Sequence, residues 1–568
     1  MNNIYNNCLK VFSICAIVLF SSQMPARAEG GDELLDILRE SMNEEFVKYS
    51  EKELPLYYMN YRAYDWSGME INASMGSLAK SSEAKARFFT ITTRVGNSEF
   101  DNYHVTKETP FNASSQIQLS LENTSKIIKG DIKRLLEDAY AAAQTDYNRR
   151  KSIVDMSPSN DMLHDFTEEV SATYYEAPYS EEEMKIDRLE WEERLKRISA
   201  IYKQYPDIFD GRATLWMTPI RKYFVSSEKS NIVENELLLR VSVTASTKDS
   251  DGNIVSLYKT WNLASVGQLP SEEEMKAETL KLIDRLNQLK NAPYAEPYSG
   301  PILFSNQAAG VFFHEIFGHR IEAHRFKLDS DGQTFKSKLG EIILPEDFSV
   351  YMDPTVKNYR GHDLFGSYQY DDEGVKGQRV TLIKDGKLND FLYNRTPVDG
   401  NSKSNGHGRA VIGANAASRQ SNLIVESSNL LSAKGIRKAF IDELKEQGKE
   451  FGYYVDEVSG GLAMIGRSLP NSFNVFPVIT YKVYVDGRPD EMVRGLSIVG
   501  TPLSVFSNVI KAGEDKVDPF NGMCGAESGW LRVSAVSPQI LVKQVETQKA
   551  EEGNEKPFII ARPMPVSK

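Results

Sequence analysis

The spacing of hydrophobic positions changes several times along the chain and predicts an α+β protein. Residues 31–54 carry apolar side chains at helical spacing among acids, which predicts an amphipathic first helix. From residue 56 to about 128 the pattern changes to short β-type runs, which favour an antiparallel sheet. Helical patterns return at about 130–150 and at about 180–204.

More β-type runs and a helix complete the first half of the chain. The strands are predicted at 212–217, 237–245 and 254–261. A helix follows at about 271–291, where Ser271 and the acids after it resemble a capping box. The next stretch, 292–301, is rich in proline and other turn-forming residues. We therefore place a domain boundary there.

The second half opens with a strongly apolar helical pattern at about 304–326. Lys384-Asp-Gly-Lys between two apolar runs predicts a hairpin. Ser432 opens a helix that extends to about residue 447, and a short helix begins near Thr501. The remaining predictions are strands at 452–455, 475–485, 493–499 and 539–542, and a glycine-rich turn at 521–529.

These patterns predict two domains, each a largely antiparallel or mixed β-sheet with flanking helices. The first domain spans 29–292 and is expected to serve substrate access or dimerisation. The second spans 300–545 and begins with the apolar helix, and residues 546–568 form a polar tail with a short terminal segment.

Residues 1–28 read as a signal peptide. Lys10 precedes the apolar run Val11–Phe20, and Ala26-Arg27-Ala28 offers a small-x-small cleavage site. The run is short for a membrane span, and no other stretch is apolar enough to cross a bilayer. We expect an exported protein, periplasmic or secreted, without a membrane span after cleavage.

Net charge excludes some partners. The formal charge is −12. Loss of the two basic residues in 1–28, a segment without acids, brings it to −14. Such a chain is a poor ligand for nucleic acids and anionic membranes.

Candidate chemistry concentrates in His314-Glu315-Ile-Phe-Gly318-His319, within a chain that has only seven histidines. An apolar helix with His-Glu and a second His can offer two imidazoles to a metal, with a carboxylate beside them. Here the histidines are five residues apart, so a regular α-helix turns their rings roughly 140° from each other. Both can bind one ion only if the helix becomes irregular, for example at Gly318. The alternative is a buried helix with incidental histidines, in which Glu315 would have no partner.

Cys524 would be the only cysteine after signal cleavage and cannot form an intramolecular disulfide. From its position alone it could be a buried residue, an intermolecular bridge, a nucleophile or a metal ligand.

Several motifs together resemble the TldD/PmbA metallopeptidase family over about 300–545. They are His314–Glu322, Asp371–Gly374 followed by 379–383, Asn405–Arg409, Gly460-Gly461 and Gly522–Gly525, in that order. The resemblance implies a zinc peptidase with one Zn²⁺ per chain, bound by His314, His319 and Cys524. It also implies that Glu315 is the catalytic base on a metal-activated water.

The resemblance further implies dimers, either of identical chains or of an active subunit with a paralogue that lacks the motif. This chain keeps the motif and resembles the active, TldD-like subunit. Known members are mostly cytoplasmic, so an exported one departs from the family. The expected substrates are short or unfolded peptides.

Other candidates are less specific. Glu322 is a possible metal ligand, but we favour a role behind a ligand or in the fold. His324 is expected at the surface or at a helix end. Asp371, Asp372 and Glu373 are predicted to form a turn rather than a cation site, and His407 with Arg409 could approach substrate or simply belong to a loop.

Two other functions remain open from sequence. One is a cysteine hydrolase that uses Cys524 as nucleophile and a histidine as base. The other is a non-catalytic exported binding or assembly protein with a structural zinc site, although a structural site has no need of Glu315.

Overall fold

The computed structural model describes residues 31–105, 116–156, 164–327, 333–399, 403–466, 472–514 and 516–549. The predicted signal peptide and the predicted tail beyond residue 549 lie outside the described residues. Among the helices of these segments, none has the length and apolar character needed to cross a membrane.

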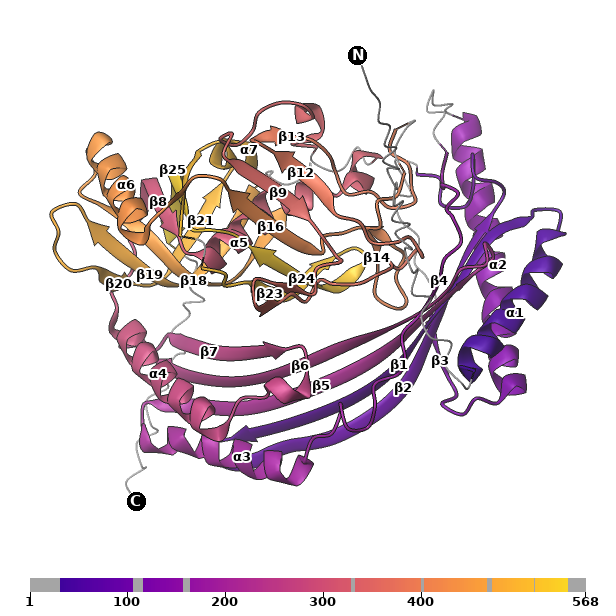
Figure 1. The fold of residues 1–568 in the computed structure, drawn as a ribbon, viewed down its shortest axis with the longest axis horizontal. Helices are drawn as coiled ribbons and strands as arrows, with labels where there is room; N and C mark the ends of the chain where they lie inside the picture. Colours follow the sequence, from indigo (N-terminus) through magenta and orange to yellow (C-terminus); the bar gives the residue numbers. More distant parts are fainter. Residues whose placement is uncertain are drawn as a thin grey trace, which may run out of the picture.

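The N-terminal half is built on one long, curved sheet. Its strands are β1 (Leu56–Ser74), β2 (Ser77–Val95), β3 (Gln116–Leu119), β4 (Thr173–Tyr175), β5 (Ile208–Ser226), β6 (Asn231–Lys248) and β7 (Ile254–Leu263). They lie in the order β3-β2-β1-β5-β6, and β4 and β7 both pair with β6. The helices are α1 (Glu33–Ser50), α2 (Ser125–Met156), α3 (Arg188–Ala200) and α4 (Glu272–Asn291). Figure 1 shows α1 and α2 at one end of this sheet and α3 and α4 at the other.

The strands of this sheet are much longer than the short runs that the sequence predicted. β1 and β2 have 19 residues each. Met75 and Gly76 join them in a tight turn with φ values of 47° and 77°, as such two-residue hairpin turns require. The short-run prediction was wrong because the first half of β2 is polar and exposed, which hides its strand pattern.

The C-terminal half contains two main sheets. The first has the order β13-β12-β9-β16-β24-β23 and the second β17-β22-β25-β21-β19-β18-β8, with β20 on β19. The strands of the first sheet are β9 (Phe348–Met352), β12 (Val380–Lys384), β13 (Lys387–Leu388), β16 (Asn422–Ser427), β23 (Phe520–Ala526) and β24 (Gly529–Val536). Those of the second are β8 (Tyr298–Phe304), β17 (Leu430–Leu431), β18 (Phe451–Met464), β19 (Ser472–Tyr484), β20 (Glu491–Val493), β21 (Leu496–Gly500), β22 (Val509–Gly513) and β25 (Ile540–Lys549). Two small ribbons complete this half: β10 (Asn358–Tyr359) with β11 (His362–Asp363), and β14 (Gly408–Arg409) with β15 (Ala417–Ser418).

One apolar helix lies between these two sheets. Helix α5 (Asn306–Ile316) contacts β18 and β19 on one side and β24 on the other. Gly310 makes this possible, because a Cβ there would lie 2.8 Å from the carbonyl oxygen of Ala535 on β24. The helix therefore sits in the main hydrophobic core of this half. The other helices here are α6 (Ala433–Glu446) and α7 (Pro502–Phe506).

The mixture of sheets and helices in each half confirms the predicted α+β class. Local signals were reliable where they rest on caps and turns. Ser271 and Ser432 accept hydrogen bonds from backbone amides of the first turns of α4 and α6 at 3.1 Å each. The predicted hairpin at Lys384–Lys387 joins β12 to β13.

The C-terminal half lies on the concave side of the long sheet (Figure 1). Buried polar contacts join the two halves. Lys222 on β5 pairs with Asp372 at 3.1 Å, and Arg532 on β24 donates to the carbonyl of Leu237 on β6 at 2.8 Å. Arg494 also pairs with Asp249 at 2.7 Å.

Candidate metal centre

The centre begins where helix α5 ends. Ser305 caps its N-terminus, and the last α-helical residue is Ile316. A short 3₁₀ helix, Gly318–Arg320, follows directly. Because the helix becomes irregular between them, the rings of His314 and His319 meet with centroids 5.0 Å apart. The expected irregularity at Gly318 is present, but the predicted extent of the helix, to residue 326, was wrong.

Two side chains explain why the helix ends there. Arg320 donates to the carbonyl oxygens of Glu315 at 2.7 Å and Ile316 at 3.2 Å, satisfying groups that the end of a helix leaves unpaired. Gln420 packs directly on Gly318, where a Cβ would lie 1.9 Å from the Gln420 Oε1 atom. A larger residue at position 318 would therefore displace the Gln420 amide.

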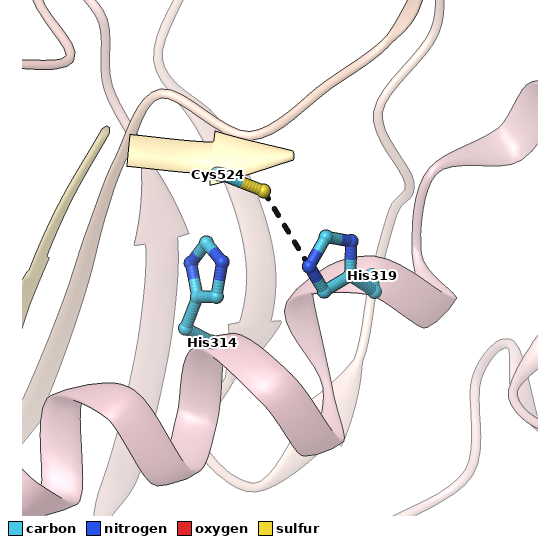
Figure 2. A group of neighbouring side chains, drawn as sticks. All are labelled: His314, His319 and Cys524. Carbon is cyan, nitrogen blue, oxygen red and sulfur yellow. Dashed lines mark hydrogen bonds between the residues drawn. The ribbon is translucent and has the colours of Figure 1, made fainter. Parts of the chain in front are cut away.

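Cys524 completes the group from the far end of the sequence. It lies on β23, an edge strand, and not in a turn as predicted; the turn comes after the strand. Its Sγ atom is 3.4 Å from Nε2 of His319. One ligand atom from each of His314, His319 and Cys524 lies within 4.8 Å of the others, and all three residues are buried. Figure 2 shows the two rings and the sulfur directed toward one another.

The charges of this group reinforce one another. Burial by itself raises the pKa of the Cys524 thiol, but the charges of His319 and His314 bring it well below its usual value. Burial likewise opposes protonation of His319, and Cys524 and Glu322 outweigh it and raise that pKa. The surroundings therefore favour the thiolate, the form of cysteine that binds metals.

Glu315 lies beside the three residues. Its Oε2 atom is 3.9 Å from Nε2 of His319. Burial raises the pKa of its carboxyl, against the opposing charges of the two histidines. Gly461 on β18 makes room for it, since a Cβ there would lie 2.4 Å from Cγ of Glu315. Of the double glycine in the sequence motif, Gly461 thus makes room for this carboxylate, whereas a Cβ at Gly460 would meet nothing within 4 Å.

Glu322 lies behind His319 and away from the sulfur. Its Oε2 atom is 3.5 Å from Nδ1 of the ring, the nitrogen opposite the one that faces Cys524. Arg325 donates to the same oxygen at 2.9 Å. A carboxylate in this position fixes the orientation of an imidazole ligand.

Sequence reasoning missed two neighbouring residues of the centre, Arg419 and Gln420. Arg419 donates to Sγ of Cys524 at 3.3 Å. Nε2 of Gln420 lies 3.5 Å from Nε2 of His314. No local pattern marks either residue, because each meets a partner more than 100 positions away. Arg325 differs from them, because its spacing of three residues from Glu322 is one at which side chains on a helix can form an ion pair.

His324 is buried, so the surface alternative was wrong; it lies near the start of a short 3₁₀ helix, Ala323–Lys327. Its ring contacts the carboxylate of Glu527, and Arg325 pairs with the same side chain at 3.0 Å. Glu527 immediately follows β23, so these contacts hold the end of the strand that carries Cys524. The helical pattern around His324 did not reveal this partner 203 residues away.

The remaining sequence candidates lie elsewhere. Asp371–Gly374 forms the predicted turn, in which Asp371 accepts from the amides of Glu373 and Val375 at 3.0 and 2.9 Å. Asp372 belongs to the contact between the halves. His407 is fully buried, which lowers its pKa to about 3. None of them lines the cleft that holds the metal group.

That cleft lies between the two halves and has a volume of about 1330 Å³. Tyr258 and Trp261 on β7 line it from the N-terminal half, together with residues of α4. His314, Glu315, His319 and Cys524 line it from the C-terminal half. Its size suits an extended peptide better than a single small molecule.

The donor set fits zinc. Imidazole nitrogen and thiolate sulfur are the ligands that zinc takes in proteins, and three protein ligands are the usual number at a catalytic zinc. Glu322 behind His319 is the kind of partner that orients such a ligand.

Comparison with known proteins agrees with the sequence motifs. Residues 297–549 match the family model of the PmbA/TldA metallopeptidase C-terminal domain. A metalloprotease of Archaeoglobus fulgidus is 28% identical over 271 residues, 46% of this chain and 56% of that protein. A metalloprotease of Methanothermobacter thermautotrophicus is 28% identical over 56% of this chain and 65% of its own length. The chain thus spans less than two thirds of these relatives. A zinc metalloprotease TldD homolog of Saccharolobus solfataricus is 25% identical over 64% of this chain and 76% of its own length.

Solved structures share the fold over almost the whole chain. TldE of Thermococcus kodakarensis aligns with a TM-score of 0.59 at 13% identity, covering 91% of this chain and 100% of that one. A putative modulator of a DNA gyrase from Thermotoga maritima aligns with a TM-score of 0.58 at 17% identity, covering 90% and 99%. Likeness at such identities shows the fold alone. The family model and the curated relatives bear out the resemblance to the TldD/PmbA metallopeptidases over residues 297–549.

Proposed function

We propose that this protein is a zinc-dependent peptidase that hydrolyses short or unfolded peptides, with Glu315 as the general base. The observation that carries the proposal is the convergence of His314, His319 and Cys524 beside Glu315 in one large cleft. The names of the relatives, metalloprotease and zinc metalloprotease, support it.

The three ligands would hold the zinc ion, which supplies Lewis acidity that lowers the pKa of water and polarises a carbonyl. Glu315 would take a proton from the attacking water and deliver it to the leaving amine. Gly461 confines the Glu315 side chain against His319, so the carboxylate stays near the three ligands.

The cleft supports the peptide as substrate class. Several of its charged side chains are paired with one another, as are Arg285 with Glu457 at 2.6 Å and Lys281 with Glu278 at 2.7 Å. In contrast, Trp530 is 67% exposed and Tyr258 is 50% exposed. Such a surface favours contacts with the backbone and apolar side chains of an unfolded chain.

Two further parts of the proposal rest on other grounds. The apolar run and small-x-small site within residues 1–28 support export to the periplasm or beyond. The resemblance of the sequence motifs to the TldD/PmbA family is the ground for proposing a dimer, with a second copy or a paralogous subunit as partner.

A thiol hydrolase is the second candidate, because Sγ of Cys524 lies 3.4 Å from His319. The two functions differ in their response to chelators. A zinc peptidase loses activity when the metal is removed and regains it with added zinc, whereas a thiol hydrolase keeps its activity throughout.

Metal content of the purified protein is the test, with His314→Ala and Cys524→Ala alongside. We expect about one zinc per chain in the wild type and its loss in both variants. Hydrolysis of a mixture of unfolded peptides should follow the zinc content. A wild-type protein that binds no zinc under any loading condition would contradict the proposal and favour a non-catalytic binding protein.

A further inference from the structure

Arg419 has an unusual position for a charged side chain. It is fully buried. Its Nη2 atom donates to the carbonyl oxygen of Cys524 at 2.7 Å and to Sγ at 3.3 Å. Its Nε atom lies 3.5 Å from Oε1 of Glu322. One guanidinium thus contacts the sulfur and the carboxylate that holds His319.

The segment that carries Arg419 touches the centre at a second point. The next residue, Gln420, reaches the ring and the carbonyl oxygen of His314 at 3.5 and 3.4 Å. Arg419 and Gln420, between β15 and β16, therefore contact Cys524 and His314 directly. Glu322 contacts both Arg419 and His319, and so connects the same segment to the second histidine. Residues from two distant parts of the sequence, 314–322 and 524, are thus held from one segment.

Charge explains why an arginine is needed there. The Cys524 thiolate and Glu322 are two negative groups in the same buried region, and burial of unpaired charges is strongly unfavourable. A planar guanidinium can donate in several directions from one rigid group, whereas the ammonium of lysine is a single point. Arg419 therefore adds a positive charge that contacts both groups, while Arg325 also pairs with Glu322 at 2.9 Å.

We propose that Arg419 is a positioning residue of the metal centre. It orients Cys524, and it withdraws electron density from the sulfur so that a bound metal stays a stronger Lewis acid. The inference rests on the proposed zinc site and deepens it. It assigns Arg419 no contact with substrate.

Cobalt(II) is a suitable probe, because a thiolate bound to cobalt gives a charge-transfer absorption band. Wild type and Arg419→Met are titrated with Co²⁺ alone, and band position and dissociation constant are measured. Loss of the donors makes the sulfur more electron-rich, so the band should move to longer wavelength. Loss of a residue behind metal ligands should raise the dissociation constant about 10- to 100-fold.

Arg395→Met is the matched control. Arg395 is equally buried but pairs with Glu228 at 2.7 Å and touches none of the three ligands. We expect this variant to keep the wild-type band position and affinity, even if it unfolds at a lower temperature. If Arg419→Met does not fold, Arg419→Lys takes its place. Its ammonium cannot bridge Glu322 and Cys524, so a weaker affinity and a shifted band are again expected.

The outcomes separate the two levels of the proposal. A wild-type protein that binds neither cobalt nor zinc contradicts the metal site itself. A wild type with the band, together with a folded Arg419 variant of unchanged band and affinity, overturns the role of Arg419 alone.

Discussion

At the scale of single residues, the centre combines groups that the sequence makes visible with groups that it hides. His314, Glu315 and His319 stand close together in an apolar run, so their chemistry can be read locally. Arg419 and Gln420 lie in a stretch without periodicity, and only the folded chain brings them to the ligands.

Glu315→Gln should separate binding from hydrolysis. The amide keeps the shape of the side chain but cannot accept a proton, so we expect unchanged zinc content and a loss of about 100- to 10,000-fold in turnover. Zinc analysis and peptide hydrolysis on the same preparation measure both.

Glu278→Gln serves as the control for Glu315→Gln. Glu278 lines the same cleft, but its nearest ionic partner is Lys281 on its own helix. We expect wild-type turnover from it. Full activity in Glu315→Gln would remove the general-base role from this residue.

At the scale of elements, the site depends on two irregularities. Helix α5 ends at Ile316, before His319, and β18 is irregular between Val455 and Gly461, where Gly461 lies against Glu315. The sequence made the first of these foreseeable, because a five-residue spacing cannot serve one ion on a regular helix. For the irregularity in β18, the paired glycines Gly460 and Gly461 were the one indication in the sequence.

Gly461→Ala should therefore act on Glu315 from the neighbouring strand. The added Cβ would lie 2.4 Å from Cγ of Glu315 and 2.7 Å from the carbonyl oxygen of Asn474. Since the backbone of β19 cannot retreat easily, the carboxylate must move. A displacement of the carboxylate by about 1 Å should reduce turnover about 100-fold. The zinc content should be preserved. Gly130→Ala on α2, where a Cβ meets nothing within 4 Å, should leave turnover unchanged; equal losses in both variants would contradict the mechanism.

The sequence predicted those parts of the fold that depend on neighbouring residues, and it missed those that depend on distant ones. Caps such as Ser271 and Ser432 and the Lys384–Lys387 turn act through neighbouring atoms, and they were located correctly. The length of β2 and the strand around Cys524 depend on pairing with distant strands, which local patterns do not contain. The predicted boundary at 292–301 precedes and overlaps the start of β8, the first strand of the C-terminal sheets.

At the scale of the whole molecule, buried ionisable groups connect the N-terminal half to the C-terminal half. Glu234 on β6 accepts hydrogen bonds from the backbone amides of Gln369 and Tyr370 at 2.7 and 3.3 Å. Burial raises its pKa to about 7, although Lys222 and these amides oppose the shift. The carboxyl therefore holds a proton in the folded protein that it releases in the unfolded chain above about pH 4.5.

The sign of the pH dependence follows. Between about pH 4.5 and 7 the folded state binds one proton more than the unfolded state at this group. The protonated Glu234 carboxyl thus makes its full contribution to the free energy of unfolding below pH 4.5. This contribution is lost as the pH rises from 4.5 through 7, by up to about 1.4 kcal/mol per pH unit.

Glu234→Gln mimics the protonated carboxyl and should remove this dependence. Urea unfolding at pH 5 and pH 8 measures it: the variant should lose less stability than wild type between the two values. Glu181→Gln, at an exposed position, should behave as wild type. The same pH dependence in Glu234→Gln and wild type would show that another group is responsible.

The separation of the candidate ligands along the chain also determines the order in which they become available during synthesis. His314 and His319 leave the ribosome about 200 residues before Cys524, which lies on the edge strand β23, whose partner among the described strands is β24. Until β24 has joined β16 and β23 has joined β24, the histidines have no sulfur to complete their group. Metal capture at the proposed site would therefore be a late event in the folding of each new chain, and a chain truncated before residue 520 would keep the His-Glu motif but lack Cys524.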